Sequence, residues 1–354
     1  MKKIFALFLT LCLTFLLAAC GSKDTNTSSS EPVSANSVNS ISSSEPKPEK
    51  ISIRYADVQA ENDSETLFAR KFAELVSNKS GGRISVEVYP NGSMGEMADI
   101  LNSVQMGALE MCRTNPSWLA DAGAPAMNLL SLPFVFEDID HANRVLDGEI
   151  GGSILQELTD NGLGVKGLGY LQPSGRYFFF TNKKVASLSD IAGLKIRVPT
   201  NSLATSMVDN LGASATPISY NELYSSLQTN IVDGADNPLK GILNMSFFEV
   251  SSSILDMAHQ YEASVVLISD SFWNKLSAED QTVLQESMNE AAAYYKELEN
   301  YNQEEYRSSL SDEGITFVTP DNIQEWVDVV QPTVKEFGAG YEDILSQINT
   351  LKDN

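Results

Sequence analysis

The sequence predicts an α/β fold with two lobes, on three observations. Residues 51–107 alternate between strand-like and helix-like patterns, which is typical of a parallel sheet covered by helices. The same alternation returns after Arg197. From Ser277 to about Ser309 one-sided apolar spacing predicts a helix of roughly 45 Å, longer than one small domain is wide. We therefore expect two lobes, each a β-sheet flanked by helices, and a long helix that braces both.

The first residues have the pattern of an export signal. Lys2 and Lys3 precede an apolar run that ends in Leu17-Ala18-Ala19, directly before Cys20. A basic start, a short apolar stretch and small residues before a cleavage point are typical of a secretory signal. The cysteine after Leu-Ala-Ala resembles a bacterial lipobox. We expect residues 1–19 to be removed and Cys20 to carry a lipid that anchors the protein to the outer face of the cell membrane, or to the periplasmic side of a membrane.

Residues 20–50 are rich in Ser, Asn, Thr and Pro and contain almost nothing apolar. Such a segment cannot bury enough apolar surface to offset its ordering entropy, so we expect a disordered tether. The formal net charge of the whole chain is -23. This charge argues against a nucleic-acid partner, because no basic face balances it.

The cysteines and histidines predict no metal site, cofactor or disulfide framework. Cys12 would leave with the signal, and Cys112 stands in an apolar context where it reads as a small buried hydrophobe. His141 and His259 lie far apart, without a cysteine or carboxylate at ligand spacing.

In the first half, residues 51–55 and 84–88 alternate as strands do, and Ser64 opens a helix that closes near Gly81. A second helix follows at 97–106. In the second half a helical turn at 188–192 precedes a strand at 194–198. Further along lie a helix opened by a Ser219–Glu222 capping box, an extended piece that breaks into a loop at 232–238, and a buried strand at 265–268.

Arg197 is the strongest candidate for a binding residue. Pro199 stops the strand that precedes it, so Arg197 lies where a strand meets a loop. In open α/β sheets ligands bind at that edge. The planar guanidinium matches a carboxylate in two parallel hydrogen bonds. We expect Arg197 to bind the carboxylate of a small organic acid, and the alternative is a structural ion pair with an acidic neighbour.

Other polar and aromatic residues lie near predicted strand ends. Arg176 precedes an aromatic strand at 178–180 that reads as buried, and Asn237 lies in the loop at 232–238. Gln59 and Asp63 follow the first strand, and Thr114 and Asn115 end another. Trp118 and Tyr170 could form the floor of a pocket, although large aromatic side chains more often belong to the core.

Several motifs recur in one order along the chain and together resemble a known family. They are Gly82-Arg83-Ile84 through Tyr89-Pro90-Asn91-Gly92, Leu132-Pro133-Phe134, Gly175-Arg176, residues 193–199, Asp233-Gly234 with Asn237-Pro238, Phe247-Phe248-Glu249-Val250 and the long late helix. In this order they look like the solute receptors of tripartite ATP-independent periplasmic (TRAP) transporters, of the dicarboxylate-receptor (DctP) type. The resemblance covers essentially everything from Ile51 onward.

The resemblance implies a periplasmic-binding-protein-like receptor, not an enzyme, that closes on an organic acid and delivers it to a membrane permease. In this family the arginine of the Lys-Ile-Arg-Val-Pro strand pairs with the ligand carboxylate, which gives that role to Arg197. Arg176 matches an arginine that often adds a second ligand contact in this family, and the alternative for Arg176 is a hinge ion pair. Asn237 matches the asparagine of a Gln-Glu-Asn-Pro loop. Here Ala235 and Asp236 depart from that loop. Thr114 and Asn115 fall where the first lobe faces the cleft.

The expected lobes are residues 51–174 with 263–302 and residues 175–262 with 303–354. We expect a monomer whose partners are the acid, the permease subunits and, through Cys20, the membrane. One alternative is a receptor that reports its solute to a membrane sensor kinase. Another is an exported hydrolase, but no Gly-x-Ser-x-Gly motif and no nucleophile paired with a histidine stand out in the sequence.

Overall fold

The computed structural model describes residues 49–352. The expected signal, the lipid site at Cys20 and the tether up to residue 48 lie outside the described residues. None of the helices within 49–352 combines the length and the apolar character that a membrane-spanning helix requires.

The strands form one mixed sheet. Eight of those described lie side by side in the order β2–β1–β3–β9–β4–β7–β5–β6, while β8 pairs with β4 and with β10. Their bounds are β1 (Ile51–Ala56), β2 (Ile84–Tyr89), β3 (Met111–Thr114), β4 (Val165–Phe180), β5 (Lys195–Val198), β6 (Ser214–Pro217), β7 (Gly234–Pro238), β8 (Ser253–Leu255), β9 (Gln260–Ser269) and β10 (Thr316–Val318).

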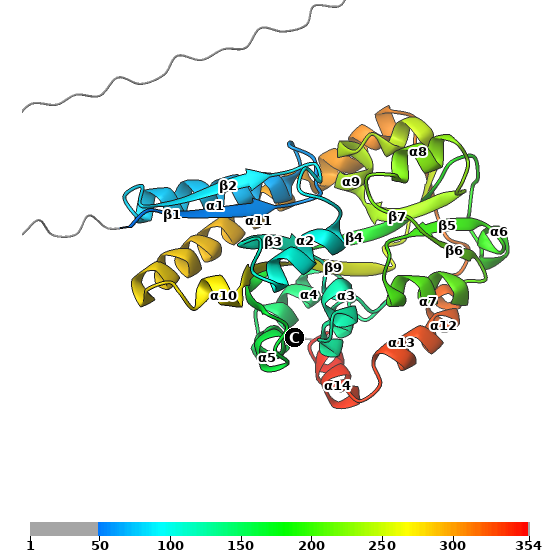
Figure 1. The fold of residues 1–354 in the computed structure, drawn as a ribbon. Helices are drawn as coiled ribbons and strands as arrows, with labels where there is room; N and C mark the ends of the chain where they lie inside the picture. Colours follow the sequence, from blue (N-terminus) through cyan, green and yellow to red (C-terminus); the bar gives the residue numbers. More distant parts are fainter. Residues whose placement is uncertain (1–48, 353–354) are drawn as a thin grey trace, which may run out of the picture. The chain divides into compact units, whose positions relative to one another are not determined.

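The prediction of a parallel sheet is right only for the two outer parts. β1 is parallel to β2 and β3, and β5 is parallel to β6 and β7. Between them, β9 and β4 are antiparallel to each other and to their outer neighbours β3 and β7. These two long strands run through the middle of the sheet and connect its two parts (Figure 1).

Helices cover both faces of the sheet. They are α1 (Ser64–Lys79), α2 (Met97–Gln105), α3 (Pro116–Asp121), the 3-10 helix η1 (Pro125–Leu130), α4 (Ile139–Leu146), α5 (Glu149–Asp160), α6 (Leu188–Ile191), α7 (Ser202–Asn210), α8 (Leu223–Gln228), α9 (Leu239–Asn244), the 3-10 helix η2 (Phe247–Val250), α10 (Asp270–Trp273), α11 (Ala278–Asp312), α12 (Ile323–Val329), α13 (Gln331–Phe337) and α14 (Glu342–Thr350).

The central strands are buried on both faces, which explains their unbroken apolar runs. In β9, Val265 and Leu267 pack toward the cluster that includes α2 and η1, whereas Val266 and Ile268 face α1 and α11. The aromatic run of β4 divides in the same way. Phe178 and Phe180 join α7 and α12, and Phe179 joins α8 and α9. The prediction that this aromatic run is a buried strand is confirmed.

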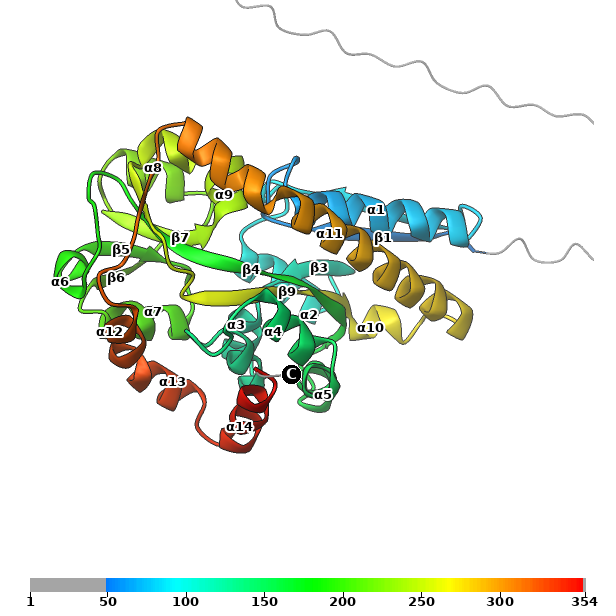
Figure 2. The same ribbon diagram turned by 180° about the vertical axis from the view of Figure 1, so that it is seen from behind.

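Helix α11 braces both parts of the fold, as expected. Ser277 caps its start, and Leu284 and Met288 pack with α1 under the first part of the sheet. Further along, Tyr306 and Leu310 pack with α8 and α9 under the second part. Figure 2, the view from behind, shows α11 crossing in front of the sheet from near α10 to α8 and α9.

Two local predictions are wrong in detail. Ser219 donates a hydrogen bond to Glu222 at 2.9 Å, but the helix begins only at Leu223. The predicted loop around Asn237 is strand β7, because its backbone pairs with β4 from Gly234 to Pro238.

The C-terminal helices return toward the first part of the sheet. Ile348 of α14 is fully buried in the same cluster as α4 and η1. The Ile348 carbonyl lies 2.8 Å from His141 Nε2. Arg144 donates to the Leu351 carbonyl at 3.0 Å. The chain therefore passes between the two parts of the sheet at β4, at β9, along α11 and again before α14.

Gly234 is expected to be essential for the pairing of β7 with β4. A Cβ at Gly234 would lie 2.4 Å from the Phe179 carbonyl oxygen, which is backbone and cannot move away cheaply. We expect Gly234→Ala to lower the free energy of unfolding by about 1–3 kcal/mol. The control Gly152→Ala, in α5, meets open space, so urea unfolding should show little loss or a small gain. Equal stability of the two variants would contradict this account of the pairing.

Candidate functional site

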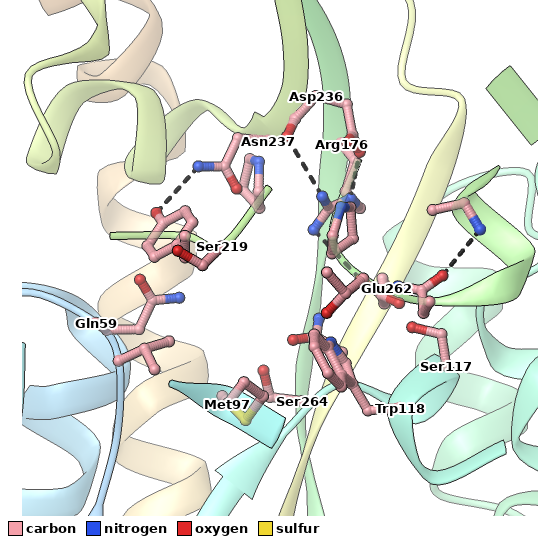
Figure 3. A pocket seen from close by; sticks show the side chains of 18 of the residues that line it. Gln59, Met97, Ser117, Trp118, Arg176, Ser219, Asp236, Asn237, Glu262 and Ser264 are labelled. Carbon is pink, nitrogen blue, oxygen red and sulfur yellow. Dashed lines mark hydrogen bonds and ion pairs between the residues drawn. The ribbon is translucent and has the colours of Figure 1, made fainter. Parts of the chain in front are cut away.

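A cavity lies between the two parts of the sheet, where β5 and β7 on one side face the start of α1 and the end of β3 on the other. Its lining combines charged, polar and aromatic side chains, shown in part in Figure 3. The lining includes Gln59, Glu65, Glu96, Met97, Arg113, Asn115, Ser117, Trp118, Arg176, Arg197, Ser219, Tyr220, Asp236, Asn237, Lys240, Gln260, Glu262 and Ser264.

Strand β5 places Arg197 in this cavity. Ile196 and Val198 pack into the core with α7, so Arg197 points to the opposite face of the strand, because successive side chains alternate. The strand is preceded by α6, which a Ser187–Asp190 capping box begins, and by Gly193 at φ 74°, which an L side chain rarely adopts. These turns fix where β5 starts and hence which face receives the arginine.

Arg197 is a buried cation without a carboxylate partner. The residue is 4% exposed. Its Nε donates to the Ile218 carbonyl at 2.9 Å, and its guanidinium lies 5.9 Å from the centre of the Tyr220 ring. No carboxylate of residues 49–352 lies within ion-pair distance of it. Burial lowers the pKa of Arg197 to about 10, although the more distant charge of Asp236 acts to raise it; the charge of Arg176 lowers it further. The side chain therefore stays protonated at neutral pH.

Arg176 differs from Arg197 because two acids neutralise it. Its Nε lies 2.7 Å from Asp236 Oδ2 on β7, and its Nη1 lies 3.3 Å from Glu262 Oε2 on β9. Burial opposes charge on all of these groups. The ion pair nevertheless outweighs it, raising the pKa of Arg176 and lowering that of Asp236. Arg176 thus ties three neighbouring strands together at the edge of the cavity.

A second buried network lies at the start of α1. Arg113 Nη2 lies 2.7 Å from Asp57 and 3.3 Å from Glu65. On the other side, Lys240 of α9 lies 3.5 Å from Glu65 and 3.7 Å from Asp63. Burial alone would raise the pKa of Glu65, but the charges of Arg113 and Lys240 outweigh it and lower that pKa to about 2. Glu65 is therefore ionised and connects the two parts of the fold.

Six of the nine predicted binding residues line the cavity together. They are Gln59, Asn115, Trp118, Arg176, Arg197 and Asn237. The other three lie outside the lining. Thr114 is fully buried within β3, Asp63 caps α1 by accepting from the Glu65 amide, and the Tyr170 hydroxyl donates to the Gly151 carbonyl at 3.0 Å.

Sequence reasoning missed several charged members of the lining, namely Glu65, Lys240 and Glu262. One signal could have found Glu262, since it is a lone acid at the start of an apolar strand. Glu65 and Lys240 lie on ordinary helix positions, and only the packing of α9 against α1 and α11 brings them together.

Metal ligands and thiols are two further groups that could carry chemistry in such a cavity. In the described part of the chain no group of His, Cys, Asp and Glu side chains could hold a metal ion. Cys112 is a free, buried thiol, as expected, and its pKa is raised by burial. Such a thiol is a poor nucleophile.

Comparisons with known proteins agree on one family. Residues 55–340 match the model for bacterial extracellular solute-binding proteins, family 7. A solute-binding protein of Roseobacter denitrificans is 31% identical over 80% of this chain and 86% of its own. The C4-dicarboxylate-binding periplasmic protein DctP of Rhodobacter capsulatus is 27% identical over 81% and 86%. The crystal structure of a TRAP periplasmic solute-binding protein from a Bradyrhizobium species, in complex with galacturonate, has a TM-score of 0.80 at 32% identity, covering 86% of this chain and all of that one.

The two buried arginines should respond to substitution in opposite ways. Arg197→Met removes a charge that has no partner, so the melting temperature of the ligand-free protein should stay the same or rise. Arg113→Met leaves Asp57 buried without its cation and leaves Glu65 with Lys240 alone, so it should cost about 3–5 kcal/mol. Thermal unfolding of both variants without ligand tests this, and a large loss in Arg197→Met would show that the arginine serves the fold.

Glu65 should contribute to acid denaturation. Its pKa in the folded protein is about 2, below the ordinary 4.5, so its stabilising effect is complete above pH 4.5 and is lost as the pH falls toward 2. In Glu65→Gln the free energy of unfolding should be lower at neutral pH and should change less over this range. Urea unfolding at a series of pH values measures the slopes. The exposed Glu74→Gln is the control, and equal slopes in wild type and Glu65→Gln would refute the assignment.

Proposed function

The chain belongs to the bacterial extracellular solute-binding proteins, family 7, and from the geometry of its cavity we propose that Arg197 captures the carboxylate of a small organic acid. The protein is an extracytoplasmic solute receptor of the TRAP transporter type, with the two-lobed α/β fold of that class. The observation that carries the proposal is the buried Arg197 guanidinium, which has no carboxylate within ion-pair distance among residues 49–352.

An anionic ligand is the natural partner of such a group. A bidentate guanidinium–carboxylate pair replaces the water that Arg197 loses on burial. Micromolar affinity requires about -8 kcal/mol. One charge-assisted pair and several further hydrogen bonds, at about 1.5–3 kcal/mol each, can supply that after the costs of closure. Asn237, Asn115, Gln59 and Trp118 line the same space and are proposed as further contacts.

Arg176 is proposed as a support of the site and not as a second carboxylate clamp. Its charge is already balanced by Asp236 and Glu262. It holds β4, β7 and β9 together beside Arg197, and of the two roles left open for it the hinge ion pair fits these contacts better.

Binding is proposed to close two lobes, residues 51–174 with 263–302 and residues 175–262 with 303–354. Within the second range, α14 is the exception, because it packs against the first lobe. The boundaries on β4 and β9 lie next to a shift in their pairing register, between Leu171 and Ser174. Hydrogen bonds across the mouth support this division. Asn221 donates to Glu96 at 2.8 Å, and the Ser202 amide donates to Asp121 at 2.9 Å. Such contacts form only when the lobes meet, and hinge closure of this kind is common around ligands.

The proposed working cycle ends at a permease. The receptor is a monomer, attached to the outer face of the membrane through a lipid on Cys20, and the closed, loaded form delivers its acid to the permease subunits. The comparisons give no support for a sensor kinase as the partner, and the relatives named above are binding proteins. Recovery of unchanged ligand after incubation, by mass spectrometry, would agree with a receptor, whereas turnover of the acid would not.

Arg197→Lys should weaken binding by at least about tenfold, because an ammonium cannot form the two parallel hydrogen bonds of the guanidinium fork. A panel of organic acids is first screened by thermal shift, and calorimetry then gives Kd for each acid that stabilises the protein. The control is Arg70→Lys, the same substitution at an exposed surface ion pair. Near wild-type affinity in Arg197→Lys would refute the carboxylate clamp.

A further inference from the structure

One cation of the cavity lining, Arg197, has no carboxylate within ion-pair distance among the described residues. Its lining carries four cationic side chains, Arg113, Arg176, Arg197 and Lys240, and four acidic ones, Glu65, Glu96, Asp236 and Glu262. Arg113 lies against Asp57 and Glu65, Arg176 against Asp236 and Glu262, and Lys240 against Glu65 and Asp63. Among the described cations of the lining, only Arg197 has no carboxylate partner. The site can therefore neutralise one ligand carboxylate.

Another part of the wall offers an unpaired hydrogen-bond acceptor, the amide oxygen of Gln59. Gln59 Nε2 donates to Glu65 Oε2 at 2.9 Å. A carboxylate can only accept, so this bond fixes the orientation of the amide and directs the carbonyl Oε1 away from Glu65. Gln59 Oε1 is buried and has no partner within residues 49–352. An unpaired buried acceptor is costly, and a hydroxyl group of the ligand would satisfy it.

Glu262 adds a fixed negative charge to the cavity wall. Its Oε1 accepts from Ser131 at 2.7 Å, and its Oε2 accepts from Asn115 at 2.7 Å and from Arg176 at 3.3 Å. Its side chain is 7% exposed. The surrounding donors hold the carboxylate in place, so it cannot turn away from an incoming anion.

Building on the proposed function, we propose that the cavity selects a hydroxylated monocarboxylate and rejects the dicarboxylate with the same carbon skeleton. The single carboxylate binds Arg197, and a hydroxyl at the other end donates to Gln59 Oε1. A second carboxylate in that place would have no hydrogen to donate. It would also lie beside Glu65 and share the closed cavity with Glu262, while every described cation of the lining but Arg197 is already paired.

The physical reason is the low dielectric of the closed cavity. A desolvated charge without a partner is strongly disfavoured, and like charges placed together add to this cost. A hydroxyl in the same place gains an acceptor instead. Family membership leaves both ligand classes open, so the distinction rests on the pairing of these particular side chains.

The test uses pairs of acids that differ at one terminal carbon. Gluconate and glucarate, and galactonate and galactarate, share their hydroxyl stereochemistry, but the second member has a carboxylate in place of the terminal hydroxymethyl group. Calorimetry at neutral pH should show the monocarboxylate bound roughly tenfold or more tightly in at least one pair. A dicarboxylate bound equally well or better in every pair that binds would overturn the inference.

Two variants test the residues. Glu262→Gln removes the fixed charge while keeping the shape, and should narrow the preference for the monocarboxylate by roughly tenfold. The control Glu110→Gln removes a charge from an ion pair with Arg54 outside the cavity and should leave the preference unchanged. Gln59→Met keeps the size of the side chain and should weaken monocarboxylate binding by roughly fivefold to tenfold. An unchanged preference in Glu262→Gln together with unchanged affinity in Gln59→Met would overturn the assignment.

The outcomes separate this inference from the proposed function. In one outcome the dicarboxylates bind as tightly as the matched monocarboxylates, and Arg197→Met abolishes this binding. That result would overturn the selection for one carboxylate and leave the carboxylate clamp standing. Binding of neither member of any pair, and of no acid in the wider panel, would overturn the carboxylate clamp and the inference with it.

Discussion

The proposed binding function depends on one buried cation, Arg197. Arg197 is buried on the cavity face of β5, with a backbone carbonyl and an aromatic ring as its neighbours and no carboxylate. Desolvation of this kind works against the folded protein, and its cost is visible in the lowered pKa of the guanidinium. A carboxylate ligand removes that cost. Part of the stability of the closed, loaded form therefore comes from the ligand itself.

The neighbouring charges are arranged so that Arg197 alone remains unbalanced. Arg176 is neutralised from both sides by Asp236 and Glu262, and Arg113 is neutralised by Asp57 and Glu65. Without these pairs, several cations would compete for the ligand and their acids would compete for Arg197. Buried pairs are weak evidence for stability, but here they hold strand ends and the start of α1 in a fixed geometry around the binding group.

The two parts of the sheet stay connected at the place where the proposed hinge lies. The strands β4 and β9 run through both parts, with irregular pairing between Leu171 and Ser174, and α11 packs under both. Irregular pairing lowers the local cost of bending, whereas a continuous helix limits the direction of motion. Lys240 on α9 lies within ion-pair distance of Glu65 and Asp63 at the start of α1, so this ion pair also joins the two parts of the fold at the cavity wall.

The sequence by itself determined the local elements and singled out Arg197 as the proposed binding cation. Apolar periodicity, glycine stops and Ser277 as a cap are signals that neighbouring residues carry, so the strand of Arg197, the helix from Ser64 and the long helix α11 could be predicted, and the ordered motifs indicated the family.

Tertiary structure decided the rest. Three features depend on segments that are far apart in the chain. They are the antiparallel insertion of β4 and β9, the strand conformation at Asn237, and the position of Glu65, Lys240 and Glu262 around one cavity. Charge pairing depends on which side chains the fold brings close together. No local sequence pattern encodes which of the four cations that line the cavity has no carboxylate partner.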